Sequence, residues 1–167
     1  MRSLITTVIL LGTLQLYVQS CGPLLEYEYI DPTLVEIVEE YAALTSEFPA
    51  YKLNVVGQTT DLIGSGLFGE CSYQHGIGYN QRDVWVVPKY HVDGPLTFKA
   101  LMFHELAHCM HGLDHLDNTL IMDTDLENNE EFWQNNWDVA IQDLMQQLHK
   151  KFRNRTHVQI DLTNYEG

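Results

Sequence analysis

The segment from residue 104 to residue 115 constrains this chain more than any other feature, with the sequence H-E-L-A-H-C-M-H-G-L-D-H. It holds four of the eight histidines of the chain. Two histidines four residues apart on a helix lie on the same face, so the imidazoles of His104 and His108 can converge on one metal ion. Glu105 then stands where a carboxylate can act as a base beside the metal. The segment therefore predicts a helix that carries a zinc site.

Two residues compete for the third ligand position of such a site, since catalytic zinc takes three protein ligands and leaves one position for water. Gly112 can adopt the left-handed conformation that ends a helix, and His115 follows it on the returning segment. Counted from His104 instead, the position falls on Asp114, whose carboxylate is also a zinc ligand. We favour His115, because a glycine takes this turn more readily than His111 would.

Two further alternatives concern residues outside this pair. On a helix, His111 would lie about 10.5 Å along the axis from His104, too far for one ion to bind both residues together with His108. We therefore expect His111 behind the ligands or at the pocket rim. A glutamate from a later helix is the other alternative, since Glu127, Glu130 and Glu131 have a suitable separation. Acidic residues also stabilise the first turn of a helix, and we favour that interpretation for all three.

The remaining sequence alternates between helical and extended patterns. A capping residue and proline at 31–32 predict an amphipathic helix that ends near residue 46. Two strands are predicted, at residues 51–60 and 83–87, and a glycine-rich connection over 61–69 follows the first of them. Pro88 suits an edge strand more than a central one, so we expect the second strand at an edge of the sheet. Residues 98–110 form the motif helix, which ends at Gly112, and residues 130–153 form a long closing helix. The pattern predicts an α+β fold.

Composition limits both size and partners. The 167 residues, 45% of them hydrophobic, suffice for one compact domain, which we place at residues 21–167. The formal net charge of −14 argues against a nucleic-acid partner and against an anionic membrane surface.

The first twenty residues predict a signal peptide, with Arg2 before an apolar stretch and a cleavage site after Ser20. The same bond is where a bacterial lipoprotein would be cut, so Cys21 is a candidate for a lipid anchor, with plain secretion as the alternative. Both predict export. In an oxidising compartment Cys71 and Cys109 are then either a disulfide or two buried free thiols.

The motif resembles that of the metzincin metalloproteases, H-E-x-x-H-x-x-G-x-x-H, with one extra residue between His108 and Gly112. Downstream, Leu120-Ile121-Met122-Asp123 resembles the metzincin Met-turn, which places a methionine beneath the zinc ligands. The chain is also similar to small exported predicted metalloproteases of bacteria and phages. These carry H-E-L-G-H-C, a histidine seven residues after the second one, and S-I-M. That spacing matches His104, His108 and His115.

The resemblance implies a small metzincin-like catalytic domain with a mixed sheet, an edge strand, an active-site helix, a Met-turn and a C-terminal helix. It implies a zinc-dependent endopeptidase with a polypeptide substrate, in which Glu105 activates a zinc-bound water. The strand at residues 84–87 would pair with an extended substrate. The alternative is a non-catalytic, zinc-stabilised surface lipoprotein that binds a partner, and such a protein would have no need of Glu105.

Overall fold

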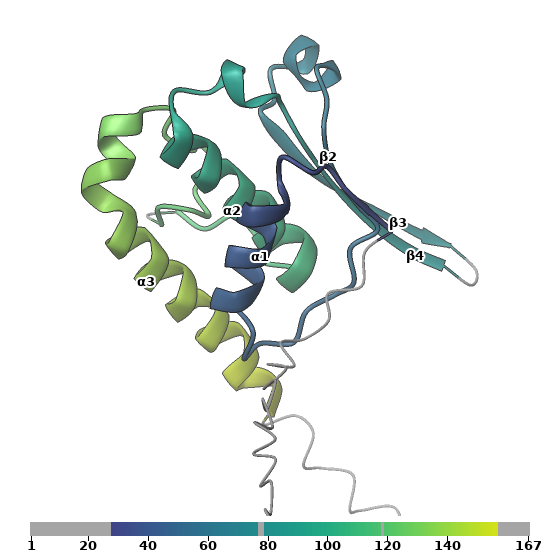
Figure 1. The fold of residues 1–167 in the computed structure, drawn as a ribbon. Helices are drawn as coiled ribbons and strands as arrows, with labels where there is room; N and C mark the ends of the chain where they lie inside the picture. The colour runs from purple at the N-terminus through teal and green to yellow at the C-terminus, as the bar shows by residue number, and fades with distance from the viewer. Residues whose placement is uncertain (1–27, 77–78, 118, 157–167) are drawn as a thin grey trace, which may run out of the picture.

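The computed structural model describes residues 28–76, 79–117 and 119–156. They form an α+β fold, as predicted, with a four-stranded mixed sheet and three α-helices (Figure 1). The predicted signal peptide and Cys21 lie outside these residues. Within them, no helix combines the length and the apolar character that a membrane span requires.

The sheet has the strand order β1-β2-β4-β3. Its parallel part consists of β1 (Tyr29–Ile30), β2 (Val55–Gln58) and β4 (Tyr79–Val86). The last strand, β3 (Gly69–Gly76), pairs antiparallel with β4 and is an edge of the sheet.

The prediction that residues 83–87 form an edge strand is wrong, because β4 lies between β2 and β3. Pro88 lies two residues beyond Val86, the last residue of β4, so it removes no hydrogen bond from either ladder. Val84 and Val86 are fully buried, as expected for a central strand. The edge strand itself was not predicted, because β3 is polar and begins with a glycine that indicated a connection.

The three helices lie on one side of the sheet (Figure 1). They are α1 (Val35–Leu44), α2 (Pro95–His111) and α3 (Glu130–Thr156), with short 3-10 turns at Asp61–Ser65 and Lys89–His91. Helix α2 packs on β3 and β4 and also contacts α1 and α3. This central place explains why α2 is apolar on nearly all sides, with Phe103, Leu106 and Met110 buried in the core.

Edge strand β3 is tied to α2 by a disulfide between Cys71 and Cys109, which decides between the two states considered for these cysteines. The two Cα atoms lie 5.5 Å apart. Since Cys109 is one helical turn beyond Glu105, the crosslink holds β3 close to the residues of the motif.

Candidate metal centre

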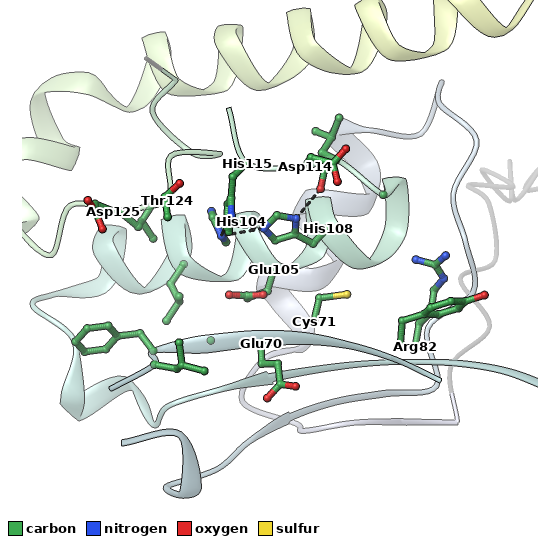
Figure 2. Close-up of a pocket in the computed structure, with 18 of the residues that line it drawn as sticks. Glu70, Cys71, Arg82, His104, Glu105, His108, Asp114, His115, Thr124 and Asp125 are labelled. Atoms are coloured by element: carbon green, nitrogen blue, oxygen red, sulfur yellow. Dashed lines mark hydrogen bonds between the residues drawn. The ribbon is translucent and has the colours of Figure 1, made fainter. Parts of the chain in front are cut away.

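Three histidine side chains meet at one point beside α2 (Figure 2). The Nε2 atom of His108 lies 3.0 Å from that of His104 and 3.1 Å from that of His115. His115 Nε2 is also 3.1 Å from His104 Nε2. The three residues therefore lie close enough to hold a metal ion.

His104 and His108 come from consecutive turns of α2, whereas His115 depends on the way the helix ends. Gly112 has φ 63° and ψ 34°, the left-handed conformation that a glycine adopts without strain. Its N–H donates to His108 O at 2.9 Å, and the next N–H, of Leu113, donates to Ala107 O at 3.2 Å. These bonds close the helix and turn the chain back toward the cluster.

Two contacts from other segments hold this turn. The ammonium group of Lys151 on α3 donates a hydrogen bond to Gly112 O. The N–H of Leu116 donates to Met122 O at 2.9 Å, so the segment that carries His115 is bound to the segment of the predicted Met-turn. Met122 itself is fully buried.

The proton positions of the imidazoles suit a metal. His104 Nδ1 lies 2.5 Å from Ile121 O, and His108 Nδ1 lies 2.5 Å from Leu113 O. A carbonyl oxygen only accepts, so each Nδ1 carries the proton and each Nε2 presents a lone pair. No hydrogen is then available between the Nε2 atoms of His104 and His108, and a bound cation would satisfy both. Backbone partners of this kind orient histidine ligands in metal sites.

Burial keeps these imidazoles neutral. Desolvation lowers the pKa of His104 to about 4, although its hydrogen bond to Ile121 O acts in the opposite direction. Burial likewise lowers the pKa of His108, again opposed by a backbone carbonyl. A neutral imidazole is the form that binds a metal, so the residues present fit a cation such as zinc.

Glu105 lies between the histidines and β3 (Figure 2), and only 5% of it is exposed. Its carboxylate accepts a hydrogen bond from the Cys71 N–H. Burial raises the pKa of Glu105 to about 8, Glu70 raises it further, and the Cys71 N–H lowers it. A cation on the histidines would oppose the upward shift by favouring the ionised carboxylate.

Gly69 leaves the space that the Glu105 side chain occupies. A Cβ atom built on Gly69 would lie 2.7 Å from Glu105 Cγ and 2.8 Å from its Cδ, distances that real Cβ atoms do not show. The Glu105 side chain therefore rests directly on the backbone of β3. The sequence indicated only a glycine-rich connection that ends at Gly69, and the contact follows from the tertiary structure.

The cluster opens into a cleft of about 710 Å³ between α2, β3 and the segment after His111. The lining residues are 66–71, Tyr73, Arg82, Leu101, His104, Glu105, His108, 112–115 and 124–126. Arg82 and Tyr73 were not predicted as site residues. No spacing in the sequence relates them to the motif, since they reach the cleft through the pairing of β3 with β4.

The other candidate ligands lie elsewhere. Asp114 lines the cleft but is not one of the three clustered residues. His111 is buried away from the cleft lining, with its Nδ1 3.0 Å from Pro49 O, so of the two places expected for it the pocket rim is excluded.

The cluster of described residues includes none of Glu127, Glu130 and Glu131. Glu130 and Glu131 lie in the first turn of α3, as predicted, whereas Glu127 precedes the helix, so the prediction is wrong for that residue. The carboxylate of Glu130 accepts hydrogen bonds from the N–H groups of Leu96 and Thr97, at 2.8 and 3.0 Å. It therefore caps the beginning of α2. Glu127 and Glu131 are exposed.

Comparisons with protein-family models, with curated proteins and with solved structures find no match to this chain. What the described residues show by themselves is a three-histidine cluster able to hold a metal ion, in a cleft whose opposite wall is a sheet edge.

Proposed function

We propose that this chain is a zinc-dependent endopeptidase with a metzincin-like site. One observation carries the proposal: three Nε2 atoms converge within about 3 Å of one another, and the buried carboxylate of Glu105 stands between them and β3, the edge strand of the sheet that the described residues form. A metal site with a purely structural role would need neither a carboxylate at this place nor an open cleft.

The donor set favours zinc. Three neutral imidazoles are borderline ligands that suit zinc, whereas calcium and magnesium take oxygen ligands. Structural zinc sites are closed by four protein ligands, and catalytic sites keep one position open. His104, His108 and His115 supply three ligands, and the cluster of described residues has no fourth member.

The chemistry divides between the metal and Glu105. Bound zinc would polarise the scissile carbonyl and lower the pKa of water toward neutrality. Glu105 accepts the proton from the attacking water and delivers it to the leaving amine. The backbone hydrogen bond from Cys71 holds the carboxylate on the sheet side of the cluster.

The expectation that residues 84–87 pair with a substrate is wrong, because β4 is paired on both sides. The substrate would pair with β3 instead. The Val87 N–H donates to Phe68 O at 2.8 Å, and the ladder continues with Gly69 opposite Val86. Because hydrogen-bonded and non-hydrogen-bonded pairs alternate in an antiparallel ladder, the backbone groups of Gly69, Cys71 and Tyr73 point away from β4. The Cys71 N–H is bonded to Glu105, which leaves the Cys71 carbonyl and the backbone groups of Gly69 and Tyr73 for a substrate. All three residues line the cleft. Such an edge can bind an extended peptide through main-chain hydrogen bonds, with little demand on its sequence.

The test is cleavage of a mixed peptide library by the zinc-loaded protein, read by mass spectrometry. Glu105→Gln removes the base and keeps the three histidines, so we expect it to hold zinc and to lose at least about 10²-fold in rate. Glu131→Gln is the matched control, since it makes the same replacement at an exposed residue and should cleave like the wild type. The proposal fails if wild type and Glu105→Gln both hold zinc and cleave equally little.

A further inference from the structure

A single arginine stands at one end of the cleft. Arg82 projects from β4, and in Figure 2 it lies at the opposite end from Asp125, with the histidine cluster between them. Among the described residues that line the cleft, it is the only lysine or arginine. The acidic residues Glu70, Asp114 and Asp125 also line it, so positive charge is confined to one end.

The guanidinium group of Arg82 is held by two aromatic rings. Its Cζ atom lies 3.8 Å from the ring centroid of Tyr51 and 4.4 Å from that of Tyr73. Its Nη1 donates to the backbone oxygen of Cys109 at 3.0 Å. Stacking and this hydrogen bond fix the plane of the group before any ligand arrives, which reduces the entropy lost on binding.

These contacts leave most of the donors of Arg82 unused. A guanidinium group has five N–H donors in a planar fork, and the bond to Cys109 O employs one of them. No carboxylate among the described residues lies within ion-pair distance of Arg82, although the chain has 23 acidic residues. The guanidinium group of Arg82 therefore keeps N–H donors for a ligand, since no carboxylate of the described residues occupies them.

We infer that Arg82 binds a carboxylate group of the substrate at this end of the cleft. The inference rests on the proposed peptidase function and names its substrate class: peptides with an aspartate or glutamate side chain, or their own C-terminal carboxylate, on the Arg82 side of the scissile bond. A planar fork matches a carboxylate with two parallel hydrogen bonds, which gives orientation as well as charge recognition. Main-chain pairing with β3 would provide affinity, and Arg82 would provide selectivity.

The experiment uses pairs of quenched fluorescent peptides that differ only in glutamate against glutamine at successive positions around the scissile bond. A second set compares a free C-terminal acid with its amide, which distinguishes the two sources of a carboxylate. For the wild type we expect kcat/KM to be at least about tenfold higher for the acidic member at one position, since a single charge-assisted hydrogen bond already gives this discrimination.

Arg82→Gln should abolish this preference, so that the ratio of kcat/KM for the acidic peptide to kcat/KM for its neutral partner falls from about tenfold to about one. Arg82→Lys, which keeps the charge and loses the planar fork, should retain part of the preference. Lys89→Gln is the matched control, because it removes one positive charge from an exposed residue outside the cleft lining. Thermal melts and zinc content identify any variant that fails to fold.

A purely structural role for Arg82 predicts another result. If Arg82→Gln folds, holds zinc and lowers kcat/KM equally for acidic and neutral peptides, the inference is overturned. Fluorescence anisotropy with the zinc-loaded Glu105→Gln protein separates the inference from the proposed function. Preferred binding of the acidic peptide, lost in the Glu105→Gln/Arg82→Gln double variant, supports carboxylate recognition even if the wild type cleaves nothing. Equal binding of both peptides refutes it.

Discussion

At the scale of single residues, the left-handed conformation of Gly112 decides which side chain completes the histidine cluster. It closes α2 and returns the chain, so that His115 meets His104 and His108. Asp114, the competing candidate, lines the same cleft without joining the cluster. The choice between the two residues is therefore open to a direct chemical test.

We expect His115→Ala to weaken zinc binding by about 10²-fold or more, because it removes one of three ligands, and replacing only a hydrogen-bond partner of a ligand already costs up to about this much. Asp114→Ala should bind zinc nearly as well as the wild type. Both affinities are measured by competition with a chromophoric chelator at pH 7.5. A large loss in Asp114→Ala alone would contradict the histidine assignment.

Gly69 is expected to position Glu105 without touching the substrate's reacting atoms. In Gly69→Ala the added Cβ would displace the Glu105 side chain, and a misplacement near 1 Å costs about 10²-fold in rate. We therefore expect kcat for peptide cleavage to fall by this order while zinc affinity stays unchanged. Gly64→Ala is the matched control, since a Cβ at Gly64 meets nothing within 4 Å. Equal kcat in both variants would show that Gly69 has no such role.

The lowered pKa of His111 predicts that the free energy of unfolding depends on pH. Burial among Tyr41, Phe48 and Phe152 lowers its pKa, Lys151 lowers it further, and the bond to Pro49 O acts in the opposite direction. Below the ordinary histidine pKa of about 6.5 the unfolded chain then binds a proton that the folded protein excludes. The free energy of unfolding should fall as the pH decreases from about 6.5 toward the folded-state pKa.

His111→Asn removes this titration and keeps a donor for Pro49 O. Denaturant unfolding of both proteins without metal, at pH 7.5 and pH 5.5, isolates the contribution of His111, because every other residue is the same in both proteins. We expect the wild type to lose stability relative to the variant on acidification, by up to about 1.4 kcal/mol per pH unit. A difference that is independent of pH would contradict the lowered pKa.

At the scale of elements, α2 begins with a cap from another helix. Gly94, the residue before α2, provides no side-chain cap, and the carboxylate of Glu130 on α3 accepts the Leu96 and Thr97 N–H groups instead. The Glu130 N–H in turn donates to the carboxylate of Asp93 at 3.2 Å. The first turns of α2 and α3 thus stabilise each other.

Glu130→Ala should therefore lower the free energy of unfolding by about 1–2 kcal/mol, the usual cost of losing a helix cap. Glu131→Ala, one residue along α3 and exposed, should change it by less than about 0.5 kcal/mol. Denaturant unfolding of the two variants side by side makes the measurement. Equal losses would mean that the carboxylate of Glu130 contributes no more than any surface glutamate.

At the scale of the whole molecule, the Cys71–Cys109 disulfide joins the sheet edge to the central helix. It closes a segment with a sequence separation of 38 residues. Cys71→Ser/Cys109→Ser should lower the free energy of unfolding by about 2–4 kcal/mol, chiefly because the unfolded chain gains freedom. Chemical denaturation without metal measures this loss, and equal stabilities of the two proteins would refute it.

The sequence predicted well what local spacing controls. The α+β class, the helix over His104 and His108, and its end at Gly112 all follow from period, capping and the backbone freedom of glycine. Its predictions failed where the pairing of segments far apart in the sequence determines the structure. Strand β3 was missed because its polar residues resemble a connection. Strand β4 was predicted at an edge because Pro88 suits an edge, and the sequence does not show which strands lie on either side of β4.

By itself, then, the sequence determined the chemical groups of the site: two imidazoles one helical turn apart, a carboxylate beside them, and a glycine from which the chain can turn back. Only the tertiary structure decided that His115 closes the cluster, that Gly69 leaves the space for Glu105, and that Arg82 reaches the same cleft. The physical reason is the range of the interactions involved. Helical spacing depends on neighbouring residues, whereas these contacts depend on the packing of β3 and β4 against α2.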